Sequence, residues 1–450
     1  MLSSPYNPFK AVFEGVLGEN GGKMDFFYKQ PRYYNKFKCI GGDCPESCCG
    51  GSWGIVWLEN EYEKLMNADM SDALRSIAEK AFVFNEELTG KDNVKKYIIK
   101  SEKRAEFSAG TYVSEDVISP DTKLNLKYKC PFQDPKTGLC FIQKELGESY
   151  LSITCRFYPR GYIVKNNIAF ANLSATCPAV FDILAEDENC TVLENRPLRN
   201  KNDLKDRYMP VINQNRIEKH LYLNYYMELL DFYGKLLNSS EHSTELSIIA
   251  GAIAAKHISD AAEKKKSNSD VKKIIDDLEK QLSAPEIYSS LNEINPNYEL
   301  KFKIVNNVIV KFFGQFGGKE LDLSYLHNGK TLVEENYFKG VENFNKAFNN
   351  KEFVIKNIII NTFYNIMSTN FNDKDTFFER YSYFTIAAAT IKLIAVAIGF
   401  SSENIRTDYR NVISRISRTI SHNRDAYHKV MLDITDLGLT TPAHLALIIK

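Results

Sequence analysis

Four of the nine cysteines lie within eleven residues of one short segment. They are Cys39, Cys44, Cys48 and Cys49, spaced C-x4-C-x3-C-C among glycines. Glycine tolerates positive φ and lets a short loop fold tightly around one point. Thiolates gathered in such a loop are typical ligands of a metal ion or an iron–sulfur cluster. Buried free thiols are ordinary for a single cysteine but explain four neighbouring ones poorly. The spacing therefore predicts ligation of a metal or a cluster.

A second set of cysteines follows later in the chain, at Cys130, Cys140, Cys155 and Cys177. Only Cys190 stands outside the two sets. Eight cysteines can serve one four-ligand site with four to spare, or two four-ligand sites. The adjacent pair Cys48–Cys49 favours two sites, because the side chains of neighbouring residues diverge and rarely reach one ion. The number of cysteines alone leaves both arrangements open.

The histidines offer no comparable pattern. All seven are scattered, and none is near a cysteine in the sequence. His422 and His428 flank an expected helix end, and we interpret them as ordinary surface or core residues. Zinc sites built from cysteine and histidine together are therefore disfavoured, and an all-cysteine site is expected.

The composition narrows the class of protein and of partner. The chain has 450 residues, enough for two or three domains, and its formal net charge is zero. A balanced charge argues against nucleic acid or an acidic membrane as partner. Residues 1–22 lack the basic-then-apolar layout of a signal peptide, which favours a reducing, cytoplasmic compartment and ligation over disulfides. Residues 1–23 are expected to form a poorly ordered extension, with Met24 as an alternative start.

The elements that must position the cysteines are short. Residues 24–190 form a loop-rich module in which Glu59–Met66 and Ser71–Phe84 are expected to be helices. Residues Gly161–Leu173 predict a β-hairpin that turns at Asn166-Asn167, since asparagine tolerates positive φ. Because this hairpin connects Cys155 to Cys177, it should bring the two thiols close together.

The remainder of the chain predicts helices. Apolar residues recur every three or four positions from Ile217 to Leu236, over Val271–Leu282, and again at Val412, Ile416 and Ile420. The segment Lys264–Ser269 is expected to be a surface connection. The apolar run Phe384–Phe400 is short for a membrane span and contains Lys392, so a buried helix is expected. The predicted fold class is mainly α: a loop-rich, cysteine-ligated N-terminal module (24–190) with a small β-hairpin, packed on a larger helical C-terminal domain (205–450).

Several common cofactor motifs are missing from the sequence. A Rossmann domain needs a strand, a glycine-rich turn and a helix. The nearest candidate, residues 308–318, has misspaced glycines and no convincing helix after them. There is no P-loop and no H-E-x-x-H helix.

Longer motifs around the cysteines resemble the flagellin lysine-N-methylase family. The likeness lies in Gln30-Pro31-Arg32-Tyr33-Tyr34, Cys39-Ile40-Gly41-x-Asp43-Cys44-x3-Cys48-Cys49, Cys140-x-Ile142-Gln143-x2-Leu146-Gly147, Leu151-x3-Cys155-Arg156-x-Tyr158-Pro159-Arg160 and Ser174-x2-Cys177-Pro178. Phe378, Arg380, Tyr381 and the terminal Ala443-His444 are similar too, so the resemblance spans most of the chain. The same cysteine layout is loosely similar to small zinc- or iron-chelating proteins.

This resemblance implies a cytoplasmic enzyme that methylates lysine side chains of a protein, such as flagellin, with S-adenosylmethionine as donor and a [4Fe–4S] cluster required. The metal ligands would be Cys39, Cys44, Cys48, Cys49, Cys130, Cys140, Cys155 and Cys177, with zinc as an alternative to the cluster or an addition to it. Arg156 and Arg160 would bind the carboxylate of the donor and Tyr158 would pack on it, or all three would brace the cysteine loops. No catalytic base is assigned. A non-catalytic iron- or zinc-binding protein and an electron-transfer protein are the alternative functions.

Overall fold

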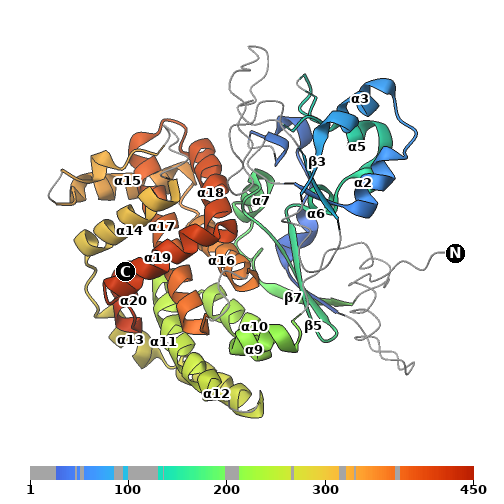
Figure 1. Cartoon of the computed structure of the whole chain (residues 1–450). Helices are drawn as coiled ribbons and strands as arrows, with labels where there is room; N and C mark the ends of the chain where they lie inside the picture. Colours follow the sequence, from blue (N-terminus) through green and yellow to red (C-terminus); the bar gives the residue numbers. More distant parts are fainter. Residues whose placement is uncertain are drawn as a thin grey trace.

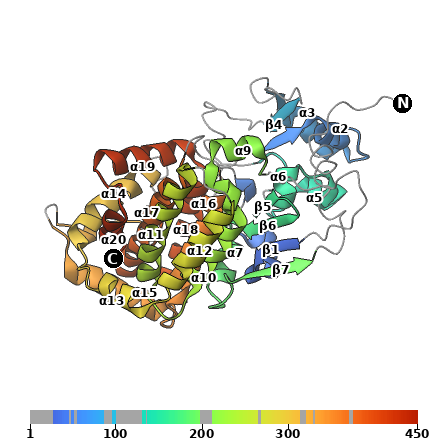
Figure 2. The same ribbon diagram turned by 90° about the horizontal axis from the view of Figure 1, so that it is seen from below.

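A computed structural model describes residues 27–45, 48–50, 55–85, 95–99, 130–134, 136–197, 212–264, 268–313, 321–328, 331–369 and 375–450. The predicted extension at residues 1–23 and the glycines at 314–318 lie outside these residues. The chain forms a small N-terminal lobe beside a large helical body, with a β-sheet and α7 (Pro178–Leu184) between them (Figures 1 and 2). This arrangement confirms the predicted fold class.

Two sheets belong to the N-terminal half of the chain. One sheet has four strands in the order β5-β6-β1-β7 and the other has three in the order β2-β4-β3. The strands are β1 (Phe27–Pro31), β2 (Val56–Leu58), β3 (Phe82–Phe84), β4 (Lys96–Ile99), β5 (Arg160–Lys165), β6 (Ile168–Leu173) and β7 (Leu193–Pro197).

The predicted hairpin is the β5–β6 pair. The two strands are antiparallel, with Lys165 opposite Ile168 at the closed end. Asn166 has a φ of 55°, the left-handed conformation that the Asn-Asn turn predicts. The hairpin prediction is thus confirmed. β1 then pairs in parallel with β6 and antiparallel with β7, which places the earliest described strand inside the sheet.

The three-stranded sheet corrects one sequence prediction. The helix α2 spans Glu59–Met66, as expected, but α3 ends at Ala81, short of the predicted Phe84. Phe82–Phe84 is instead a strand that pairs with β4. The Phe82 ring makes an edge contact with Trp57 at a centroid distance of 5.1 Å. Cross-strand pairing and aromatic packing therefore outweigh the helical spacing of the apolar residues.

The helices follow the sequence pattern elsewhere. The N-terminal lobe also holds α5 (Phe141–Leu146) and α6 (Ile153–Phe157). The helical body contains α9 (Gln214–Lys219), η6 (Leu221–Tyr225), α10 (Tyr226–Asn238), α11 (Thr244–Glu263), α12 (Asn268–Gln281), α13 (Pro285–Asn292), α14 (Tyr298–Phe313), α15 (Glu334–Ala347), α16 (Phe353–Ser368), α17 (Phe377–Ser401), α18 (Ile405–His422), α19 (Arg424–Asp436) and α20 (Pro442–Ile449). Val308–Val310 lies within α14, so no Rossmann strand exists there.

The central element of the body is α17. It begins with a capping box between Thr376 and Glu379, and it is apolar all round. Among the described residues it is the one helix long and apolar enough to cross a membrane, and 83% of its most apolar window is buried inside the protein. Burial against α11, α15, α16 and α20 explains its composition, and the predicted buried helix is confirmed.

The described residues form two hydrophobic cores. The large core runs from the four-stranded sheet through the helical body and includes Cys177 and Cys190. The small core lies in the N-terminal lobe around Trp57 and Phe132, with Cys130 and Cys140 packed against it. The cysteines of the second set are therefore divided between two cores.

Candidate metal centre

The predicted ligands come from short elements and loops of the N-terminal half. Cys39 and Cys44 flank the turn η2 (Gly41–Asp43), and Cys48 and Cys49 open the turn η3 (Cys48–Gly50). Cys155 lies on α6, which Ser152 caps by accepting a hydrogen bond from the Cys155 amide. Cys140 pairs with Gln133 in an isolated β-bridge, and the Cys130 amide donates a hydrogen bond to the Cys49 carbonyl at 3.0 Å. Cys177 is the N-cap residue of α7.

A close backbone contact joins the two cysteine sets. A Cβ atom on Gly42 would lie 2.1 Å from the carbonyl oxygen of Thr137, so no side chain fits there. Asp134 shapes that turn by accepting hydrogen bonds from the Lys136 amide and the Thr137 hydroxyl, both at 2.9 Å. The first cysteine loop thus rests on the turn between Cys130 and Cys140.

Seven of the eight predicted ligands are neighbours. Burial raises the pKa of Cys155, and the nearby thiols Cys130 and Cys48 raise it further. Burial likewise raises the pKa of Cys177 to about 12, with Cys44 and Cys48 adding to the effect. We call this set the thiol group: Cys44, Cys48, Cys49, Cys130, Cys140, Cys155 and Cys177. Crowded thiols suppress one another's ionisation, and a bound cation reverses that suppression.

Two cysteines lie apart from the thiol group. Cys39 is exposed, and its sulfur accepts a hydrogen bond from the Gly41 amide at 3.4 Å. Cys190 is fully buried in the large core, and burial and the Asp187 carboxylate raise its pKa to about 12. Within the described residues, no three cysteine, histidine or acidic side chains stand close enough to hold a metal. The thiols are therefore neighbours and not yet an assembled ligand shell.

The donor set fits the groups that the sequence predicts. No member of the thiol group forms a disulfide, so the seven residues keep the thiol chemistry that metal ligation needs. Four thiolates suit a [4Fe–4S] cluster or a tetrahedral zinc ion equally well. Seven neighbouring thiols are more than one four-ligand site needs. Two such sites need eight ligands, so Cys39 would have to be the eighth.

The three predicted donor contacts, Arg156, Tyr158 and Arg160, make local contacts around the thiol group. The Tyr158 hydroxyl donates to the Thr176 hydroxyl at 3.0 Å, next to Cys177. The Arg160 guanidinium lies over the Phe37 ring, 4.9 Å from its centroid, and Arg156 lies over Phe157 at 5.0 Å. These contacts brace the cysteine loops and leave donor binding by the three residues as a prediction.

Sequence reasoning missed Arg418, which reaches the thiol group from α18. A hydrogen bond with Cys49 and then the charge of Arg418 lower the pKa of Cys48 to about 7, against the effect of burial. Burial raises the pKa of Tyr158, and Arg418 partly opposes it. The apolar positions Val412, Ile416 and Ile420 identified α18 as a helix, but the nearness of its other face to Cys48 depends on tertiary structure.

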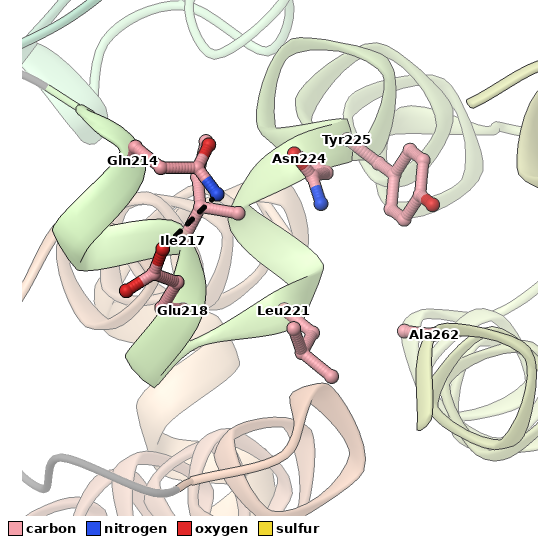
Figure 3. A pocket seen from close by; sticks show the side chains of 7 residues that line it. All are labelled: Gln214, Ile217, Glu218, Leu221, Asn224, Tyr225 and Ala262. Carbon is pink, nitrogen blue, oxygen red and sulfur yellow. Dashed lines mark hydrogen bonds between the residues drawn. The ribbon is translucent and has the colours of Figure 1, made fainter. Parts of the chain in front are cut away.

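A solvent-open cavity of about 290 Å³ lies elsewhere, between α9, η6 and α11 (Figure 3). On its wall Gln214 donates to the Glu218 carboxylate at 3.4 Å. Its lining residues are Gln214, Ile217, Glu218, Leu221, Asn224, Tyr225 and Ala262. None of them is a predicted site residue, so this cavity does not bear on the metal centre.

Comparison with known proteins identifies the helical body. The FliB lysine N-methylase C-terminal domain matches residues 231–448, from α10 to α20. The flagellar biosynthetic protein FliU of Salmonella muenchen is 25% identical over 179 residues, which cover 40% of this chain and 89% of that protein. The lysine-N-methylases of Salmonella choleraesuis and Salmonella typhimurium are each 27% identical over 169 residues, or 38% of this chain.

These matches differ in how much of each relative they cover. The chain aligns with only 35% of the length of each of the two lysine-N-methylases. No solved structure matches the chain significantly. The C-terminal domain match and the three Salmonella relatives agree with the resemblance in the cysteine motifs, and the helical body of this chain is therefore similar to the C-terminal domain of the FliB lysine N-methylases.

Proposed function

We propose that this protein transfers methyl groups from S-adenosylmethionine to lysine side chains of a protein substrate and requires a [4Fe–4S] cluster. The observation that carries the proposal is the match of residues 231–448 to a lysine N-methylase domain. The thiol group supports the cluster, and the charge of Arg418 in that domain lowers the pKa of Cys48, a member of this group. Residues that would hold it are among Cys44, Cys48, Cys49, Cys130, Cys140, Cys155 and Cys177, with Cys39 as a further ligand.

The proposed reaction is a displacement at carbon. The lone pair of a neutral lysine nitrogen forms the new N–C bond, while the S–C bond breaks and its electrons stay on sulfur. A free lysine amine has a pKa of about 10.4, so the site must remove a proton before transfer. Orientation of the two reactants supplies most of the remaining rate enhancement. When bound, the cluster would supply a Lewis-acidic iron beside the donor, or would hold the cysteine loops together.

The proposed substrate is a protein with accessible lysines in the cytoplasm, such as flagellin. The similarity to lysine N-methylases supports a protein substrate. One relative is named a flagellar biosynthetic protein, which makes flagellin the first substrate to test. Arg156, Tyr158 and Arg160 remain proposed donor contacts.

A second candidate function is binding of iron or zinc without catalysis. The observation in its favour is that Cys130 and Cys140 pack on the small core while Cys177 belongs to the large one. A metal held by these thiols would connect the two cores, which is a structural role in itself. Under this hypothesis the metal is needed for folding, and the methyl donor does not bind.

Two measurements on protein purified without oxygen separate the candidates. The first is the content of iron, sulfide and zinc together with the absorption spectrum; about four irons and four sulfides per chain with a band near ~400 nm fit a cluster. The second is transfer of radiolabelled methyl groups to flagellin and to flagellin whose lysines are blocked by acetylation. Label on unblocked flagellin alone supports the methyltransferase. Bound metal with no label on flagellin or on other lysine-rich proteins supports the metal-binding protein.

A further inference from the structure

The helix α18 buries a polar face as well as an apolar one. Its apolar face packs in the large core through residues such as Val412 and Ile416. Asn411, Ser414 and Arg418 lie on the other side of the helix, and Ser417 borders them next to the turn of Ile413. We call these four residues the polar face of α18. Ser414 is 0% exposed and Ser417 is 5% exposed. Burial of a polar helix face is costly unless its groups find partners.

Three atoms of this face have no hydrogen-bond partner among the described residues. Asn411 Oδ1, Ser414 Oγ and Ser417 Oγ are buried and make no hydrogen bond with any described part of the chain. Buried serine and threonine hydroxyls on α16 and α17 behave differently, because the four named next each donate to the carbonyl four residues earlier. On α16 and α17 these hydroxyls belong to Thr362, Ser382, Thr385 and Thr390, at donor–acceptor distances of 2.8–3.0 Å. The orphan atoms of α18 therefore call for a ligand, since native interiors leave few polar groups unsatisfied.

The position of this face points to the proposed active site. The helix α18 packs against α7, which Cys177 precedes as N-cap, and Arg410 of α18 pairs with Asp182 of α7 at 3.5 Å. In Figure 1, α18 and α7 lie side by side at the junction between the helical body and the N-terminal lobe. The positive charge of Arg418, on the same face, acts to lower the pKa of Cys48 and of Tyr158, which belong to the N-terminal half of the chain. A ligand held here would lie between the family's C-terminal domain and the thiol group.

The chemistry of the four residues selects the ligand. A guanidinium forms paired, charge-assisted hydrogen bonds with a carboxylate. An amide oxygen such as Asn411 Oδ1 accepts from an ammonium group, and serine hydroxyls donate or accept. Together they complement the carboxylate and ammonium of an α-amino acid.

We infer that the polar face of α18 binds the amino-acid end of the methyl donor, with Arg418 on the carboxylate and Asn411 on the ammonium group. This inference rests on the proposed function. It assigns donor binding to the C-terminal domain, whereas the sequence motifs pointed to Arg156, Tyr158 and Arg160 in the N-terminal lobe.

The test compares two ligands by isothermal titration calorimetry on the full, anaerobically purified chain. S-adenosylhomocysteine has the amino-acid end, and 5′-methylthioadenosine lacks it. R418Q should weaken binding of S-adenosylhomocysteine by roughly 10- to 100-fold, the range for a lost charged hydrogen bond. S414A and S417A should each weaken it by about fivefold. The affinity for 5′-methylthioadenosine should stay unchanged in all three variants. The control R406Q should leave both ligands unaffected, because Arg406 is an exposed residue of the same helix that donates to the Ala347 carbonyl.

The outcomes separate this inference from the proposed function. Unchanged S-adenosylhomocysteine affinity in the three variants would overturn the inference, even if the wild type binds the donor and methylates protein. Equal losses for both ligands would also overturn it, because they would report a general disturbance of the site. Failure of the wild type to bind either ligand, at full metal content, would overturn the proposed function as well. Thermal melting of each variant confirms that the fold is retained.

Discussion

At the scale of single residues, Gly42 decides whether the two cysteine sets can meet. In G42A the new Cβ would overlap the Thr137 carbonyl, which is backbone and cannot rotate away. The loop from Cys39 to Cys44 must then move, and we expect G42A to lose most of its bound metal. The matched control is G161A, because a Cβ at Gly161 meets no atom within 4 Å. Metal content by mass spectrometry checks the pair; equal content in both variants would show that the contact is dispensable.

The cysteines themselves give a second residue-scale prediction. C155S removes a member of the thiol group and should lower the metal content, since serine is a poor ligand for iron and zinc. C190S should bind as much metal as the wild type, because Cys190 lies in the large core beside Asp187 and outside the thiol group. Metal loss in C190S alone would mean that the ligand set is assigned wrongly.

At this scale the sequence predicted which cysteines lie near one another, and their role as metal ligands stays a prediction. Spacing and local context predicted which cysteines gather, and seven of the eight are neighbours in the structure. Arg418 could not be found in the same way, because more than two hundred residues separate it from Cys155 and Cys177. Nothing in a local pattern encodes which face of a distant helix approaches a loop.

At the scale of elements, the burial of Lys301 on α14 makes the folding stability depend on pH. Lys301 is 2% exposed, and burial together with the charge of Lys392 lowers its pKa to about 7. Between pH ~7 and ~10.4 the unfolded chain therefore binds a proton at Lys301 that the folded chain does not. Folding stability should rise with pH across that window, because less free energy is then needed to remove the Lys301 proton on folding. As the pH falls toward 7, that cost returns and stability decreases.

The variant K301M tests this assignment. It should be more stable than the wild type by about 2–4 kcal/mol at pH 7, and the difference should vanish near pH ~10.4. K303M is the matched control, because Lys303 lies on the same helix with an exposed side chain and should change stability by less than about 0.5 kcal/mol. Urea unfolding at pH 7 and pH 10 measures both, and a pH-independent difference would refute the assignment.

Helices and hairpin turns were predictable at the element scale, and the sheets were not. The Asn166-Asn167 turn and the 3.6-residue periodicity are local signals, and they located β5, β6, α2 and, in the body, α10, α12 and α18. Strand pairing depends on distant partners: Phe27 pairs with Ile168, and Phe84 pairs with Tyr97. That is why Phe82–Phe84 looked like the end of a helix, and why β1 and β7 were missed.

At the scale of the whole molecule, Asn361 on α16 ties the sheet to the helical body. Its amide donates to the Tyr33 hydroxyl and to the Leu173 carbonyl, both at 2.7 Å, and its oxygen accepts from the Ala175 amide at 3.2 Å. The side chain is fully buried. N361L would leave those partners unsatisfied, and we expect a loss of about 3 kcal/mol or more in the free energy of unfolding.

Urea denaturation of N361L beside N336L checks this expectation. Asn336 also donates to a carbonyl, that of Tyr325 at 2.7 Å, but at a solvent-accessible position where water can replace it. N336L should therefore cost less than about 1 kcal/mol. Similar losses in the two variants would show that Asn361 does not couple the sheet to the body.

The position of β1 has a consequence for how the polypeptide acquires its fold during synthesis. Its neighbours β6 and β7 end at Leu173 and Pro197, so both are translated about 140 residues or more after Phe27. A ribosome adds about 5–20 residues per second, which leaves β1 without its partners for several seconds. The strand β1 is thus synthesised early but gains its pairing partners late. In a nascent chain arrested before Leu193, the edge of β1 that pairs with β7 is exposed and can bind chaperones or other strands.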